Sequence, residues 1–248
     1  MTNERMLFQL ATHNLAKIAI KLECFFYIIE QACDDTHPVI HHYALKNILE
    51  IMTLAEKPEL KSRFLKELIR IEHVLNTKGI KISNLPYGDV SEQIQRLSGI
   101  CGGFGGSIHH NVFLQSLRLA HRTSHDETEF NAPQFLYWLE GRSSKRQQDL
   151  RDWFEELLHL RDSVATYLGL FRNTAIFEQI NILNGFYHCQ LTGKSTCHLV
   201  LLKLDRSSGF IPKVHVGHHG LTIRLNDAAT LEEVKPESLL LEVAICQL

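Results

Sequence analysis

The hydrophobic pattern of this 248-residue chain changes from helical to extended near residue 177. Before that point apolar side chains recur every three or four residues, for example at Leu15, Ile18, Leu22 and Ile29, which is the period of one helix face. After it, short runs such as LTIRLN at 221–226 alternate apolar and polar residues, which is typical of a half-buried strand. We therefore expect an α+β protein, in which an N-terminal all-helical bundle domain (1–177) precedes a small C-terminal antiparallel β-sheet or barrel-like domain (178–248).

Proline, glycine and capping residues indicate where individual elements begin and end. One helix is expected to end at about Cys33, a second to follow Pro38, and a third to run from Pro58 to a stop near Gly79, because proline suits a first helical turn and glycine suits a helix end. A long helix is expected from about 144 to 171, and strands at 198–205, 221–226 and 239–245. The run CGGFGGS at 101–107 predicts a flexible break.

The overall charge is close to neutral, with 26 Lys and Arg against 28 Asp and Glu, and 44% of the residues are hydrophobic. This composition excludes an intrinsically disordered chain and disfavours a broad DNA-binding face. The most apolar stretch, at 18–29, is interrupted by Lys21 and Glu23 and is shorter than the ~20 residues that span a bilayer. No signal peptide is evident, so we expect a cytoplasmic protein with reduced cysteines and no membrane insertion.

Fifteen histidines leave open a metal-dependent enzyme or metal-binding protein as an alternative function. His37 and His41, or His121 and His125, have the i, i+4 spacing of metal ligands on a helix. Cys189 and Cys197 have histidine neighbours, but strand alternation would place each cysteine and its neighbour on opposite faces. A third ligand and supporting residues are not evident for either histidine pair, and half-buried or solvated histidines are the favoured interpretation.

The sequence contains no recognisable catalytic arrangement. The glycine run lacks the Gly-Lys-Ser/Thr ending of a phosphate-binding loop, and no preceding strand makes it a dinucleotide fingerprint. No nucleophile can be paired with a particular histidine, and no two carboxylates share an apolar setting. We therefore expect a protein that is not an enzyme and that uses no cofactor or metal.

Local groups of basic residues are the remaining functional signal, and together they would suit a charged binding groove. Two pairs have i, i+4 spacing, and further cations occur on or near the predicted strands. The cluster at 215–219 can gain positive charge as the pH falls toward 6. The candidate groove residues are Lys17, Lys21, Arg118, Arg122, Lys213, His218 and Arg224.

Motifs spread along the chain resemble the ZapD family, the Z-ring-associated cell-division proteins of proteobacteria that bind the tubulin-like GTPase FtsZ. The most specific is LNGFY at 183–187, at the change from helical to strand pattern. The others are Leu7-Phe8, KLECFFYII at 21–29, FLKEL at 64–68, Pro133 followed by Trp138-Leu139, Ile223-Arg224, and LEVAIC at 241–246. Their order and spacing over about 240 residues carry the resemblance.

The resemblance implies a symmetric homodimer without catalytic activity that grips the C-terminal tail of FtsZ through a basic surface and cross-links filaments at midcell. It also implies that Lys21, Arg118 and Arg224 occupy basic family positions. Two departures are present: SHDETEF at 124–130 replaces a more apolar link, and Gly220 stands at a second basic position near Arg224. His218 and His219 could compensate for that loss, which predicts tail binding that depends on pH.

Overall fold

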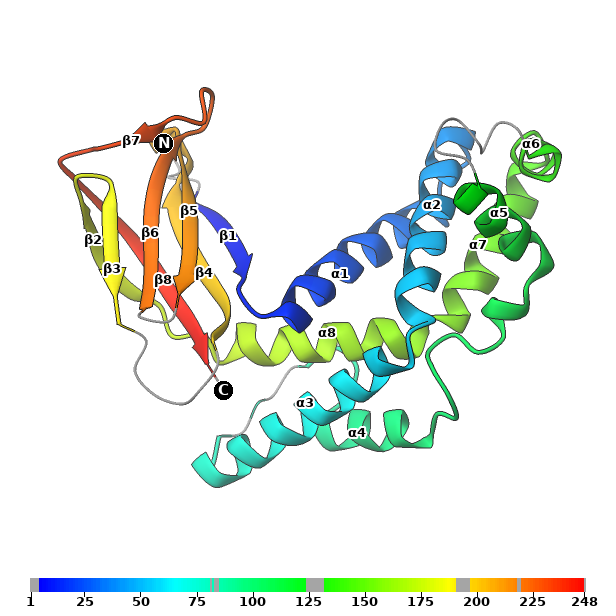
Figure 1. The fold of residues 1–248 in the computed structure, drawn as a ribbon, viewed down its shortest axis with the longest axis horizontal. Coiled ribbons are helices and arrows are strands. Elements are labelled where there is room, and N and C mark those ends of the chain that lie inside the picture. The colour runs from blue at the N-terminus through cyan, green and yellow to red at the C-terminus, as the bar shows by residue number, and fades with distance from the viewer. Residues whose placement is uncertain are drawn as a thin grey trace. The chain divides into compact units, whose positions relative to one another are not determined.

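The computed structural model describes residues 5–80, 82, 85–123, 132–190, 197–217 and 220–247. After a first strand, β1, the helices come before the remaining strands along the chain, and the predicted α+β class is confirmed (Figure 1). The helices are α1 (Asn14–Ala32), α2 (Pro38–Ala55), α3 (Pro58–Lys78), α4 (Val90–Gly99), α5 (Val112–Thr123), α6 (Pro133–Leu139), α7 (Ser143–Glu156) and α8 (Leu158–Asn173), with 3-10 turns η1 (Ile108–His110) and η2 (Arg206–Ser208). Within the described residues, no helix is both long and apolar enough to cross a membrane.

The strands form one antiparallel sheet in the order β1-β4-β8-β2-β3-β6-β5, and β7 pairs with β6. Predicted strands at 198–205, 221–226 and 239–245 are confirmed as β4, β6 and β8, and Asn184-Gly185 forms the turn between β2 and β3. The strand bounds are β1 (Arg5–Ala11), β2 (Glu178–Leu183), β3 (Phe186–Cys189), β4 (Cys197–Asp205), β5 (Phe210–Gly217), β6 (Gly220–Asp227), β7 (Glu233–Val234) and β8 (Ser238–Gln247).

The chain divides into two compact units, and the division differs from the predicted boundary between 177 and 178. One unit, the sheet unit, contains Met1–Ile18 and Leu168–Leu248, and the other, the helical unit, contains Ala19–Tyr167. The difference at the N-terminus arises because β1 pairs with β4 along its whole length, from Arg5 opposite Asp205 to Ala11 opposite Leu199. The division falls inside α1 and α8.

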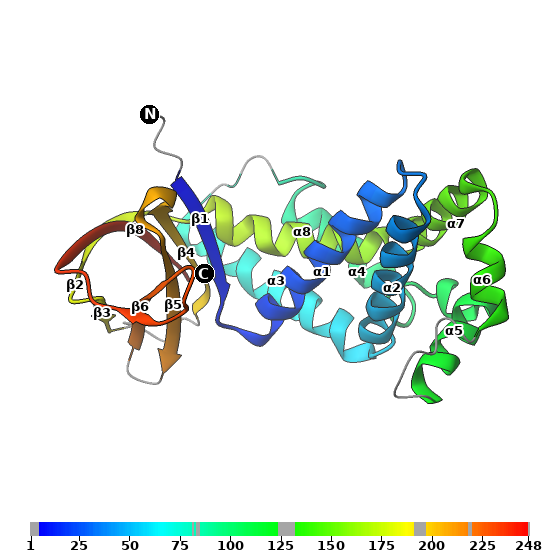
Figure 2. The same cartoon turned by 90° about the horizontal axis from the view of Figure 1, so that it is seen from above.

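The sheet curls so that one face encloses an apolar core (Figure 2). Ile182, Leu202, Ile223 and Val243 come from four different strands and belong to this core, each buried to 5% exposure or less. Alternation along each strand turns the other residues outward. The outward face of β6 and its neighbours is therefore available for polar and charged side chains.

The helical unit is built on apolar stripes that the sequence pattern predicted. Leu22 and Ile29 of α1, Ile48 of α2, and Phe64 of α3 are fully buried. The predicted helix end near Gly79 is confirmed, and Gly79 has the left-handed backbone that glycine permits (φ 65°). The predicted long helix from 144 to 171 is instead two helices, α7 and α8, because the chain leaves helical geometry at Leu157 (φ −100°, ψ 1°).

The glycine run at 101–107 forms neither helix nor strand, as predicted, but its central side chain is anchored. Phe104 is 1% exposed and packs edge-on against Phe64, with 6.3 Å between ring centroids. Gly105 has a left-handed backbone (φ 66°), and a side chain there would meet Ile108 and Leu157 at about 3 Å. Glycine lets the backbone come this close, so the run brings Phe104 into the core.

Candidate functional site

Four exposed side chains form a continuous row across the outward face of β5, β6, β3 and β2. Arg224 of β6 lies opposite Lys213 of β5 on one side and Phe186 of β3 on the other. Phe186 lies opposite Leu183 of β2 across the hairpin. Because directly opposite residues of antiparallel strands point to the same face, the row has a cationic half, Lys213 and Arg224, and an apolar half, Phe186 and Leu183. We call these four residues the outer row.

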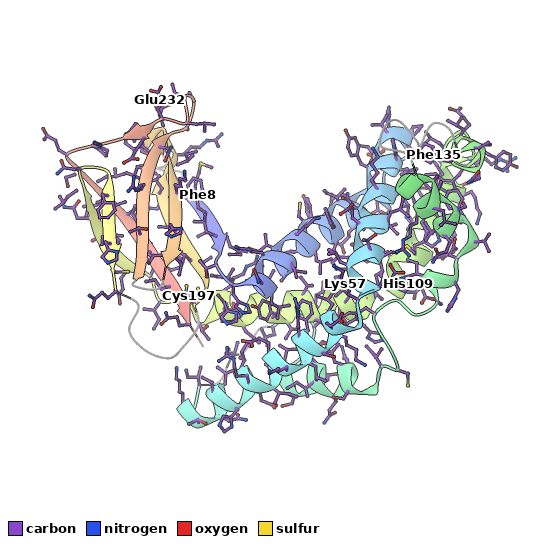
Figure 3. The ribbon with its side chains drawn as sticks, viewed as in Figure 1. Phe8, Lys57, His109, Phe135, Cys197 and Glu232 are labelled. Atoms are coloured by element: carbon purple, nitrogen blue, oxygen red, sulfur yellow. The ribbon has the colours of Figure 1, made fainter. Side chains whose placement is uncertain are left out.

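Arg224 makes two contacts within this face. Its Nη1 lies 3.0 Å from Oε2 of Glu233, and both side chains are about half exposed. Its guanidinium carbon lies 5.8 Å from the centroid of the Phe186 ring, within the range of a cation–π contact. Glu233 is brought there because β7 pairs with β6, with Glu233 opposite Asn226. Glu232, the residue that precedes Glu233, is labelled in Figure 3 and shows where β7 lies.

Two histidines lie beside the outer row on the same face. Thr222 is two residues from Arg224 on β6, and its register partners are His215 of β5 and His188 of β3. Both imidazoles are exposed. The sequence indicated His215 as part of the cluster at 215–219, whereas it pointed to His188 only as the neighbour of Cys189. His218 and His219 lie outside the described residues.

Lys21 lies on an exposed face of α1, as its spacing predicted. Its Nζ is 3.1 Å from Oε2 of Glu50 on α2 and 5.1 Å from the centroid of the Phe25 ring. Both partners of the ion pair are 52% exposed, so solvent screening keeps the pair weak. Lys17, one turn earlier on the same helix, is also exposed.

Arg118 is nearly buried, whereas a groove residue would be exposed. Its side chain is 5% exposed and forms a hydrogen-bonded ion pair with Glu56, the residue that ends α2. Its Nε is buried, with no hydrogen-bond partner among the described residues. The i, i+4 partner Arg122 lies in the last turn of α5, but its side chain is outside the described residues.

Among the predicted groove residues whose side chains are described, Lys213 and Arg224 lie side by side on the sheet, and Lys17 and Lys21 lie one turn apart on α1. Lys21 and Arg118 belong to the helical unit, where they have separate partners on α2. Leu183, Phe186 and Glu233 were not identified as site residues. The Asn184-Gly185 turn carried a usable signal, since a two-residue hairpin turn places its flanking residues opposite each other.

Two of the histidines in the metal alternative have other roles in the described structure. His37 caps α2 by accepting a hydrogen bond at Nδ1 from the backbone of Val39. His41 is fully buried: its Nδ1 accepts from Nε of Arg146 at 2.8 Å and its Nε2 donates to the Asp35 carbonyl at 2.8 Å. Both nitrogens of His41 are thus used, and burial lowers the pKa of this imidazole. The side chains of His121 and His125 lie outside the described residues.

The cysteines with histidine neighbours also have other surroundings. Cys197 is buried and accepts a hydrogen bond from the hydroxyl of Thr12 at 3.5 Å. His198 is buried and stacks on Phe171 with ring centroids 4.6 Å apart. Burial raises the pKa of the Cys197 thiol, which disfavours the thiolate form that binds metals. Among the residues that the structure describes, no three His, Cys, Asp or Glu side chains gather closely enough to hold a metal ion.

Comparison with known proteins identifies one family. The family model described as "ZapD: Cell division protein" matches residues 20–224. Relatives named "Cell division protein ZapD" include those of Chromobacterium violaceum, 24% identical with 91% of each chain covered, and Ralstonia pickettii, 26% identical with 88% of this chain and 89% of the relative covered. The one from Coxiella burnetii is 24% identical over 84% of this chain and 83% of its own length. These names describe cell-division proteins and state no enzymatic activity.

Proposed function

Because this chain belongs to the ZapD family of cell-division proteins, its role lies in cell division, and we propose that it acts there by binding FtsZ. In this proposal the protein is a non-enzymatic adaptor without a cofactor that grips the C-terminal tail of FtsZ. A homodimer would hold two tails, cross-link FtsZ filaments and promote Z-ring assembly at midcell. The cytoplasmic location follows from that partner.

The observation that carries the proposal is the extent of the family match. It covers residues 20–224, which include Lys21, Arg118 and Arg224, the three cations that the resemblance assigns to basic family positions. The structure supports a role for Arg224 most directly, because Arg224 is half exposed and lies in register with Lys213. Two adjacent cations on a sheet face suit a carboxylate-bearing peptide.

The physical strength of such a site fits reversible bundling. Exposed charge pairs contribute only about 0.2–1 kcal/mol each and weaken as salt screens them. A single tail is therefore expected to bind weakly and in a salt-sensitive way. A dimer facing tails repeated along a filament can gain roughly 10²- to 10⁴-fold in avidity, which makes dimerisation part of the proposed mechanism.

A direct test measures binding of a fluorescent FtsZ tail peptide by anisotropy at low and high salt. Arg224→Glu is expected to weaken binding at least tenfold, because it removes one cation and creates a carboxylate beside Lys213. Light scattering checks that the dimer persists in this variant. Normal tail binding by Arg224→Glu, at the same dimer mass, would show that the site is elsewhere.

Lys213 offers the matched test of the second cation in the outer row. Lys213→Met removes a charge next to Arg224 without introducing a repulsive one, so a smaller loss of about two- to fivefold is expected. Lys235→Met, at an exposed lysine beyond β7, makes the same chemical change outside the row. Equal losses in the two variants would indicate a general charge effect.

A further inference from the structure

The apolar half of the outer row, Leu183 and Phe186, is about half exposed to solvent. Leu183 is 55% exposed and Phe186 is 44% exposed, whereas the inward neighbour of Leu183 on β2, Ile182, is fully buried and that of Phe186 on β3, Tyr187, is partly buried. Isolated exposed apolar residues are common and need no explanation. Here two of them are direct register partners, and the Phe186 ring also lies within cation–π range of Arg224.

The hairpin between these two side chains is constrained by its backbone. Asn184 and Gly185 both have left-handed φ values, 51° and 72°, as a two-residue hairpin turn of the primed type requires. A side chain at Gly185 would come within 2.0 Å of the carbonyl oxygen of Val234, so the turn lies directly against the end of β7. The apolar half is consequently held in place before any ligand arrives, and binding loses less conformational entropy.

The charges of the row favour one kind of occupant. Lys213 and Arg224 supply two cations, and the carboxylate that contacts the row in the described residues is that of Glu233. Acidic groups of a ligand are thus attracted to one half, whereas the neighbouring half can bury an apolar side chain. Burial contributes roughly 25 cal/mol per Å² of apolar surface, so a modest apolar contact rivals an exposed ion pair.

We propose that Leu183 and Phe186 are the specificity-determining apolar anchor of the site, selecting an acidic peptide with an apolar side chain next to its carboxylates. This inference rests on the proposed function, and it adds a requirement that charge alone does not impose. An acidic sequence without an adjacent apolar residue binds the cationic half only and is held more weakly.

The test is a double-mutant cycle between protein and peptide. Wild type and Phe186→Ala are each titrated with the FtsZ tail peptide and with a version in which its apolar residues are serine. We expect Phe186→Ala to weaken binding of the native peptide about three- to tenfold and to leave binding of the serine peptide unchanged. Phe186→Leu is expected to retain most of the affinity.

The matched control is Leu240→Ala. Leu240 is 62% exposed on β8, and its register partner is Asn181, which is outside the outer row. The same kind of truncation there is expected to change affinity less than twofold. Circular dichroism and thermal unfolding check that all variants remain folded.

Three results would overturn the inference. Equal losses for the native and serine peptides in Phe186→Ala would show that Phe186 does not read an apolar group, while the proposed function would stand. Tighter binding of single-stranded DNA than of peptide, lost in Phe186→Ala, would assign the row to base stacking instead. Absence of binding of either peptide to wild type would reject the proposed function itself.

Discussion

Arg224 and Glu233 form an ion pair with 3.0 Å between Nη1 and Oε2. The cation that is proposed to bind the tail is therefore already paired with a carboxylate of the same chain. Both side chains are accessible, at 52% and 43% exposure, and the pair is therefore weak and exchangeable. An acidic peptide has to compete with Glu233 for Arg224. This competition lowers the affinity for a single tail.

Removing the competitor is expected to strengthen binding. Glu233→Gln should increase tail-peptide affinity about two- to fivefold, because an exposed pair of about 0.2–1 kcal/mol no longer opposes the ligand. Glu232→Gln, one residue away, removes the same charge without removing the contact to Arg224. Anisotropy titration compares the two variants, and an equal gain in both would mean that only net charge matters.

Lys21 and Glu50 allow a test in which the two partners should act with opposite signs. If Lys21 binds the tail, Lys21→Met weakens tail binding, whereas Glu50→Gln strengthens it by freeing the lysine from its partner at 3.1 Å. Either change should cost less than about 1 kcal/mol of folding stability, because the pair is exposed. Binding that is unchanged in both variants would leave Lys21 without a role in the site.

The buried contact between His41 and Arg146 predicts a pH-dependent stability. Burial lowers the pKa of His41, and the Arg146 cation adds to this effect, so the unfolded chain takes up this proton at a higher pH than the folded protein. The contribution of neutral His41 is complete above the unfolded pKa of about 6.5 and is lost as the pH falls from there toward the folded value.

The measurement is urea unfolding of wild type and His41→Gln between pH 8 and pH 5. Glutamine can still accept a hydrogen bond from Arg146 but does not titrate. The stability advantage of wild type should therefore be largest at pH 8 and should shrink below pH 6.5, by at most about 1.4 kcal/mol per pH unit. A difference that stays constant with pH would contradict this account of His41.

Phe104 lies within the glycine run, and its burial is expected to stabilise the helical unit. Phe104→Ala should lower the free energy of unfolding by about 3–5 kcal/mol, as is typical for a fully buried phenylalanine. Val112→Ala, at a side chain that is 83% exposed, should change it by less than about 0.5 kcal/mol. Denaturant unfolding distinguishes the two, and a loss below 1 kcal/mol for Phe104→Ala would mean that the run is not anchored.

The hydrophobic period of the sequence predicted the helices and strands that have a buried face. The α1, α2 and α3 stripes and the alternation in β4, β6 and β8 are visible in the sequence because each has one buried face. Strand β1 was missed, because RMLFQLA shows no regular alternation and its partner residues on β4, from Leu199 opposite Ala11 to Asp205 opposite Arg5, lie far along the chain. Such pairing is decided by tertiary contacts, to which a local pattern is insensitive.

The candidate site was predictable to a similar extent. Arg224 was identified from its strand position and the family resemblance, but its partner Glu233 becomes visible only once β7 pairs with β6. Arg118 has the spacing of an exposed helix face, yet Glu56 at the end of α2 holds it in a nearly buried position. Non-local ion pairs of this kind leave no signature in the sequence around either residue.

The central claim is that the protein cross-links filaments by holding FtsZ tails, and a pelleting assay with polymerised FtsZ tests it most directly. Full-length FtsZ with this protein should pellet at low speed as bundles, and FtsZ lacking its C-terminal tail should remain as single filaments in the supernatant. Bundling that persists after tail deletion would contradict the account.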